Sequence, residues 1–156
     1  MNTIVIGTDG SPGARAAVTH GLELARRLGT RVIFVFVRPD TWLLGDPYYQ
    51  HRLSEQLARS RAALGPAIDE AEAASVEAEH EVVEGDTSDE LIRAARYHDA
   101  ELIVVGSRGL GALAGAVLGS TSARLVQHSP IPVLVVKEPA PCANGNGRQQ
   151  VLESAS

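Results

Sequence analysis

Glycine and hydroxyl residues recur along one stretch of the chain at a spacing that suits phosphate binding. Gly106 and Gly109 are followed by Gly119-Ser120 after nine intervening residues. Glycine lets backbone N–H groups approach an anion closely because no Cβ is in the way. A helix that begins near Ser120 would add free N–H groups from Gly119, Ser120 and Thr121, together with two hydroxyls. This stretch therefore predicts a phosphate site.

The distribution of charge favours the same interpretation. The chain has a net charge of -5, yet residues 102–136 contain no Asp or Glu and include Arg108 and Arg124, with Lys137 directly after them. A local excess of positive charge would attract a phosphate group. The alternative interpretation is an apolar core segment that carries few charges of either sign.

Apolar patterns predict the elements that position this loop. The predicted strands are Thr3–Gly7, Arg31–Val37, Glu79–Glu84, Leu102–Val105 and Pro132–Val136. The predicted helices are Pro12–Leu28, a long helical stretch from after His51 to about Val76, Asp86–His98 and Thr121–His128. Alternating strands and helices imply an α/β fold with a doubly wound parallel sheet. Ligands bind at the carboxyl edge of such a sheet, which is where Gly106 falls.

Local signals refine the helix predictions. Ser11-Pro12 is typical of a helix cap followed by the first helical residue, and Gly29 is expected to end that helix. Gly65-Pro66 predicts a bend or an interruption in the long helix. The buried face of that helix is predicted from Leu53, Leu57, Leu64, Ile68 and Ala71.

Composition also indicates which predicted strands lie at the edges of the sheet. The strand Glu79–Glu84 is short and less apolar, as expected at or near an edge. Pro132–Val136 is expected to be an apolar edge strand, which invites pairing with the same strand of a second chain. The helix before it is expected to bury Val126, together with Ala123 or Leu125.

Composition limits the class of protein. The 156 residues, 44% of them hydrophobic, suffice for one ordinary domain, and residues 138–156 are expected to form a disordered polar tail. No apolar run reaches the roughly 18 residues of a membrane span, and no leader pattern is present, so we expect a cytoplasmic protein without a membrane partner. The single cysteine excludes disulfide scaffolds and thiolate metal sites. Nucleic acid is not expected as a partner, because no basic stripe with aromatic residues is present.

Other phosphate motifs fit less well. The P-loop pattern G-x-x-x-x-G-K-[ST] is absent. A dinucleotide fingerprint can be written as Gly109-x-Gly111-x-x-Ala114, but the acidic residue required about 20 positions later is missing. The five histidines share no spacing that predicts a metal site.

Three segments share their pattern with a known family. The opening I-V-I-G-T-D-G-S, the spacing G-x-x-G-x9-G-[ST] and the later S-P-I-P-V-L-V-V-K resemble the ATP-binding branch of the universal stress protein family. The resemblance covers about residues 1–137 and is weak between residues 38 and 80. It implies a Rossmann-like adenine nucleotide-binding domain over residues 1–137, with strand order 3-2-1-4-5. It also implies a homodimer formed through Pro132–Val136.

The resemblance further implies which residues surround a nucleotide. Those expected around the adenosine are Gly7, Thr8, Asp9 and Val37. Those expected around the ribose and phosphates are Val105, Gly106, Gly109, Gly119, Ser120, Thr121 and Ser122. ATP with Mg²⁺ is the expected ligand, and Asp9 can accept hydrogen bonds from ribose hydroxyls or hold the cation. Because Ser11 can cap the next helix, Asp9 is expected to be free for the ligand.

Two features near this site have more than one interpretation. Arg108 is not fixed by the motif, so it either reaches a terminal phosphate or points to solvent. Trp42, Tyr48 and Tyr49 cluster after the second strand, where they would form a lid over the adenine or simply pack a long loop.

Three functions remain for the chain. The first is an ATP-binding stress-response or signalling module in which nucleotide switches a dimer, with cyclic AMP as an alternative ligand. The second is a slow ATPase or an autophosphorylating protein with Ser120 or Thr121 as phosphoacceptor. The third is a nucleotide-independent interaction scaffold. The loop has no Gln, Glu or His to orient an attacking water, which argues against fast hydrolysis, and its many glycines argue against a scaffold.

Overall fold

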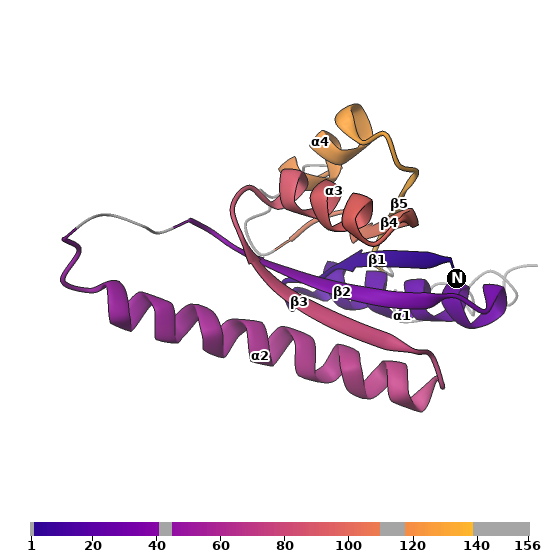
Figure 1. The fold of residues 1–156 in the computed structure, drawn as a ribbon, viewed down its shortest axis with the longest axis horizontal. Coiled ribbons are helices and arrows are strands. Elements are labelled where there is room, and N and C mark those ends of the chain that lie inside the picture. The colour runs from indigo at the N-terminus through magenta and orange to yellow at the C-terminus, as the bar shows by residue number, and fades with distance from the viewer. Residues whose placement is uncertain (1, 41–44, 110–117, 139–156) are drawn as a thin grey trace, which may run out of the picture.

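A single parallel sheet forms the centre of the computed structural model, which describes residues 2–40, 45–109 and 118–138 (Figure 1). Its strands are β1 (Thr3–Gly7), β2 (Arg31–Arg38), β3 (Ala78–Glu84), β4 (Ala100–Gly106) and β5 (Val133–Val136). They are hydrogen-bonded in the order β3-β2-β1-β4-β5, and every neighbouring pair is parallel. The doubly wound sheet and its strand order are therefore confirmed.

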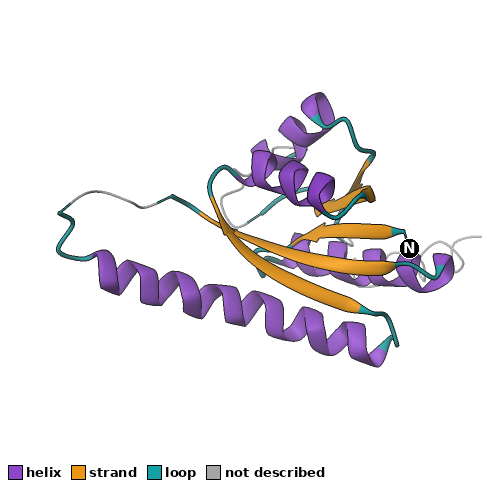
Figure 2. Ribbon diagram, viewed as in Figure 1, coloured by secondary structure: helices purple, strands orange, loops and turns teal. Residues whose placement is uncertain are grey.

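Helices cover both faces of this sheet (Figure 2). They are α1 (Pro12–Leu28), α2 (Tyr49–Ala73), α3 (Thr87–Tyr97) and α4 (Ser120–His128). Side chains alternate along β1, so that Ile4 and Ile6 pack with α1 and α2, whereas Val5 packs with α3 and α4. None of the helices in the described ranges is long and apolar enough to cross a membrane.

The ends of α1 follow the local signals in the sequence. The Ser11 hydroxyl accepts a hydrogen bond from the N–H of Ala14 at 3.2 Å, and Pro12 is the first helical residue. Gly29 ends the helix with φ 64°, in the left-handed region that glycine adopts without strain. The start of α1 is thereby fixed close to the end of β1.

Of the bend or interruption expected at Gly65-Pro66, the interruption is wrong, because α2 is one continuous helix of 25 residues. Pro66 lies on the exposed side, while residues on both sides of it pack against the sheet. The buried positions of α2 are Ser60, Ala63, Leu64, Ala67 and Ala71. This burial offsets the backbone hydrogen bond that proline cannot donate.

The predicted buried faces need two corrections. Leu57 is 40% exposed, since the first turns of α2 extend beyond the sheet (Figure 1). On α4 the expectation for Val126 is wrong, because this side chain is 57% exposed while Leu125 is fully buried. A helix as short as α4 has room for one inward-facing row of side chains, and Leu125 and Ser122 occupy it.

Replacing Gly65 by alanine should stabilise the protein by up to about 1 kcal/mol, because glycine inside a helix loses more backbone freedom on folding than alanine does. Apart from its chain neighbours and the backbone of its own helix, a Cβ at Gly65 would meet nothing within 4 Å. The ring of Pro66 disfavours a Cβ on the helical residue before it, which reduces the gain. Chemical denaturation measures the difference. Gly21→Ala in α1 is the contrasting variant: its Cβ would lie 2.4 Å from Cδ1 of Ile6, so it should destabilise. A lower midpoint for Gly65→Ala would contradict the prediction.

Candidate functional site

One cleft lies where β1, β2 and β4 reach their carboxyl ends. Every site residue expected from the sequence borders it: Gly7, Thr8, Asp9, Val37, Val105, Gly106, Arg108, Gly109, Gly119, Ser120, Thr121 and Ser122. The cleft is also lined by Ser11, Ala14, Val35, Thr87 and Leu91, which were not anticipated. Segments from both halves of the chain thus converge on one site.

The inner wall of the cleft is apolar. Val35 and Val37 come from β2, Val105 comes from β4, and Leu91 comes from α3. Leu91 is only 1% exposed, and its Cδ1 lies 3.0 Å from where a Cβ on Gly7 would stand. A flat apolar group such as a nucleobase fits a wall of this kind.

Glycines allow the β4 loop to pass directly over the start of α1. A Cβ on Gly106 would lie 2.5 Å from the carbonyl carbon of Gly13, and a Cβ on Gly13 would lie 2.4 Å from the oxygen of Arg108. Backbone atoms cannot move aside cheaply at such distances. Gly106 is therefore required for packing against α1, a reason that differs from the expected approach of its backbone to phosphate.

Asp9 is held between the first turn of α1 and the glycine loop. Its Oδ1 accepts a hydrogen bond from the N–H of Ser11 at 2.9 Å, although the hydroxyl of Ser11 caps α1 as expected. Contact of Asp9 with a ligand stays a prediction. A Cβ on Gly109 would lie 2.7 Å from Oδ2 of Asp9. Gly109 thus leaves space for a carboxylate that is fixed in place and borders the cleft.

The loop before α4 is fastened to Ser107. The carbonyl oxygen of Ser107 accepts hydrogen bonds from the N–H of Gly119 at 2.6 Å and from the hydroxyl of Ser122 at 3.0 Å. The N–H of Gly119 is therefore not available to a phosphate, contrary to expectation, and the Ser122 hydroxyl points into the protein. Within the part of the chain that the structure describes, the N–H groups of the first turn of α4 have no hydrogen-bond acceptor.

The start of α4 differs from the starts of the other two helices at the cleft. Ser11 caps α1 and Asp86 caps α3, each through its side chain. For α4, the N-cap residue is Gly119, and no side chain of the described residues caps it. Gly119 itself has φ -70° and ψ 166°, and a Cβ there would come no closer than 3.4 Å to any described residue beyond its chain neighbours. The packing of the described residues does not require glycine at this position.

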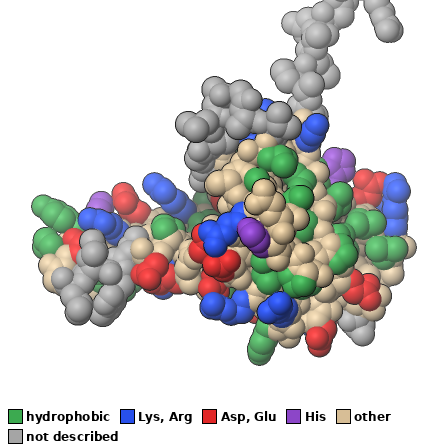
Figure 3. Space-filling view, turned by 90° about the horizontal axis from the view of Figure 1, so that it is seen from above, with side chains coloured by type: hydrophobic (Ala, Val, Ile, Leu, Met, Phe, Trp, Pro, Cys, Tyr) green, Lys and Arg blue, Asp and Glu red, His purple; other side chains and the backbone are tan. Residues whose placement is uncertain are grey.

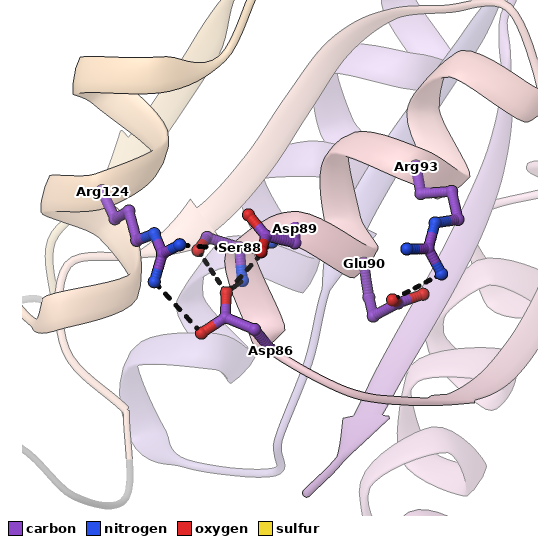
Figure 4. A network of polar contacts seen from close by, with 6 residues as sticks. All are labelled: Asp86, Ser88, Asp89, Glu90, Arg93 and Arg124. Atoms are coloured by element: carbon purple, nitrogen blue, oxygen red, sulfur yellow. Dashed lines mark hydrogen bonds and ion pairs between the residues drawn. The ribbon is translucent and has the colours of Figure 1, made fainter. Parts of the chain in front are cut away.

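The excess of positive charge around the cleft is smaller than the sequence indicated. Arg108 is exposed and borders the cleft. Arg124 instead contacts the carboxylates of the α3 cap residue and of the first turn of α3, with its Nη1 3.4 Å from Asp86 and its Nη2 3.6 Å from Asp89 (Figure 4). Acidic and basic side chains are also interspersed over the face that carries α3 and α4 (Figure 3). Positive charge at the cleft therefore comes from Arg108 and the helix N-termini.

Asp86 is the most strongly held carboxylate near the site. Its Oδ1 accepts hydrogen bonds from the Ser88 hydroxyl at 2.6 Å and from the N–H of Asp89 at 3.2 Å. These donors, with the nearby charge of Arg124, keep the pKa of Asp86 below its usual range. Asp86 stays ionised at neutral pH, so it remains an acceptor that fixes the start of α3.

Several earlier expectations fall outside the cleft or outside the described residues. Neither Tyr48 nor Tyr49 is among the described residues that line the cleft, and Tyr48 is 66% exposed at the start of α2. Trp42, Gly111 and Ala114, as well as the tail from residue 139, lie outside the described residues. Over the ranges that are described, no three His, Cys, Asp or Glu side chains gather as a metal site.

Two of the residues missed by sequence reasoning share a cause. Thr87 and Leu91 belong to the helix that follows β3, and a helix that follows a parallel strand begins at the carboxyl edge of the sheet. The strand order would have placed this helix near the site, but nothing in the sequence sets its tilt toward β1.

Comparison with known proteins gives a consistent result. The family model described as the universal stress protein family matches residues 1–137. A universal stress protein of Thermus aquaticus is 32% identical over 138 residues, which cover 88% of this chain and 99% of that relative.

Two solved structures have the same fold. A universal stress protein from Lactobacillus plantarum superposes with a TM-score of 0.74 at 24% identity, covering 86% of this chain and 97% of that one. A universal stress protein crystallised in complex with cAMP superposes with a TM-score of 0.70 at 29% identity, covering 88% of this chain and 98% of that one.

Proposed function

The chain belongs to the universal stress protein family, and from this premise we propose that it binds an adenine nucleotide, ATP with Mg²⁺, in the cleft at the carboxyl edge of its sheet. Adenine lies against the apolar wall formed by Val37, Val105 and Leu91. The phosphates lie at the first turn of α4, beside the glycine loop. The protein acts in stress response or signalling, and its dimer responds to the bound nucleotide.

The observation that carries this proposal is the start of α4, for which none of the side chains that the structure describes is a cap. The first N–H groups of a helix need an acceptor, and they carry the positive end of the helix dipole. The other helices at the cleft receive that acceptor from Ser11 and Asp86. At α4 the N-cap is a glycine that faces the cleft, so a phosphate supplies the missing acceptor to Ser120, Thr121 and Ser122.

Asp9 and Arg108 extend the phosphate site on its other side. The fixed carboxylate of Asp9 accepts hydrogen bonds from the ribose hydroxyls or contacts the cation that accompanies ATP. Arg108 reaches the terminal phosphate. A bound Mg²⁺ would neutralise phosphate charge, and these residues fit it because one carboxylate and the phosphate oxygens are hard oxygen ligands.

Cyclic AMP is the second candidate ligand. The relative of known structure at 29% identity was crystallised with cAMP. Backbone N–H groups recognise a phosphate oxygen without regard to the number of phosphates, so the start of α4 does not by itself discriminate between the two nucleotides.

The backbone of a single residue, Ser107, supports the link between nucleotide and dimer. The N–H of Ser107 donates to the carbonyl of Val136 in the edge strand β5 at 2.8 Å, while its carbonyl accepts from Gly119 and Ser122 at the start of α4. We propose that two chains pair through β5, so that the dimer edge and the phosphate site share this connection.

Mass spectrometry of the nucleotide released when freshly purified protein is denatured tests the proposal. ATP in the released fraction supports the ATP-bound form, and cyclic AMP supports the second candidate. Isothermal titration of the stripped protein with each nucleotide then ranks them. Failure of both adenine nucleotides to bind at millimolar concentration would leave the nucleotide-independent scaffold as the better function.

Hydrolysis of ATP should be slow. The carboxylate of Asp9 already accepts the N–H of Ser11, and the described residues that line the cleft include no Glu, Gln or His to orient an attacking water. Turnover should therefore stay far below the roughly 1–100 per second of kinases, even with magnesium. A steady-state phosphate-release assay measures it. Several turnovers per second, abolished by Gly119→Ala, would identify an enzyme instead.

A further inference from the structure

The helix that begins at the phosphate site is weakly anchored by its own side chains. α4 has nine residues, and among them only Ser122 and Leu125 are buried. Helices of this length are unstable alone, so contacts with neighbouring elements must fix the direction of α4. Its neighbour across the cleft is α3, with which Leu125 shares an apolar cluster through Leu91 and Ala94.

Arg124 adds a second connection between these helices (Figure 4). Its guanidinium reaches Oδ2 of Asp86 at 3.4 Å and Oδ2 of Asp89 at 3.6 Å. Asp86 is itself immobilised, because its Oδ1 accepts hydrogen bonds from Ser88 and from the N–H of Asp89 in the α3 cap. Arg124 therefore contacts a rigid anchor. A planar guanidinium that spans two carboxylates constrains direction as well as distance.

The two helix starts joined by Arg124 both border the cleft. Thr87 lines it from the first turn of α3, and Ser120 and Thr121 line it from the first turn of α4. Arg124 lies one helical turn after Ser120, on the side that faces α3. A change in the tilt of α4 would thus move the N–H groups of its first turn relative to the apolar wall.

From this geometry we propose that Arg124 is a positioning residue for the phosphate site: its ion pairs with Asp86 and Asp89 hold the first turn of α4 at the orientation in which its N–H groups face the phosphates. The inference rests on the proposed nucleotide-binding function. Arg124 also neutralises two carboxylates that would otherwise repel a phosphate from this side of the cleft.

The test compares Arg124→Gln with Arg93→Gln. Arg93 belongs to the same polar network but pairs with Glu90 of its own helix at 2.7 Å, so it is a matched control that leaves α4 untouched (Figure 4). Titration calorimetry measures the affinity for ATP and for adenosine, and the difference between them reports the contribution of the phosphates. Arg124→Gln should weaken ATP binding about threefold to tenfold and leave adenosine within about twofold, because exposed ion pairs contribute modestly. Arg124→Lys should recover part of the loss.

A second measurement does not depend on nucleotide. Amide hydrogen exchange of the segment 118–128 in nucleotide-free protein should be faster in Arg124→Gln than in wild type or Arg93→Gln. If wild type binds no nucleotide, the proposed function fails, and this exchange difference alone decides whether Arg124 positions α4. Equal exchange in all three proteins would overturn the inference. An equal loss of ATP and adenosine affinity, or the same loss in Arg93→Gln, would also overturn it.

Discussion

Gly119→Ala should leave the protein folded and weaken ATP binding at least about tenfold. The backbone angles at Gly119 suit any residue, and a Cβ there would come no closer than 3.4 Å to the rest of the described chain. The added methyl group would instead occupy cleft space beside the N–H groups that receive the phosphate. Loss of one charge-assisted phosphate contact weakens binding by about 1.5–3 kcal/mol. Isothermal titration measures the affinity, and thermal unfolding measures the stability.

Two other glycines show why Gly119 is the informative position. Gly106→Ala would bring a Cβ to 2.5 Å from the backbone of Gly13, so its effect on binding would include damage to the fold. Gly65→Ala is the matched control, because it adds the same methyl group in α2 at a residue that does not line the cleft. Wild-type ATP affinity is expected for Gly65→Ala. Unchanged affinity in folded Gly119→Ala would mean that the phosphates do not lie at α4.

The sequence allowed prediction of part of the site because several of its residues end or follow a strand at the same edge of the sheet. Gly106 ends β4 and is followed by Gly109, and Gly7 ends β1, so a parallel order brings them together without knowledge of any side-chain contact. The strand order itself came from the family resemblance, since apolar patterns alone identify strands but not their neighbours.

Contacts between elements explain what the sequence could not predict. The close approach of Gly13 to Gly106 depends on how α1 crosses β4, and the capture of the Gly119 N–H depends on where the Ser107 carbonyl points. Neither has a local signature. The interruption predicted at Pro66 is absent for the same reason. A proline usually breaks a helix, but burial of its neighbours against the sheet keeps α2 continuous.

The edge strand β5 offers its outer backbone groups for pairing. Ile103 of β4 donates to the carbonyl of Pro132 at 2.9 Å, and Ser107 donates to the carbonyl of Val136 at 2.8 Å. Because backbone groups alternate along a strand, those of Leu134 also face β4, whereas those of Val135 face the open edge. The side chain of Leu134 is 38% exposed beside this edge. An apolar, open edge is suited to pair with a second copy of itself.

Val135→Pro should therefore convert a dimer into a monomer while the fold persists. Proline at this position removes an N–H that points away from β4, so the dimer loses a hydrogen bond and meets a bulky ring, but the sheet within the chain keeps its own bonds. Sedimentation equilibrium at micromolar concentration measures the assembly, and circular dichroism measures the fold. Leu134→Pro is the matched contrast, since it removes an N–H that faces β4 and should destabilise the fold itself. A monomeric wild type would contradict the proposed dimer, and a Val135→Pro protein that remains dimeric would place the interface elsewhere.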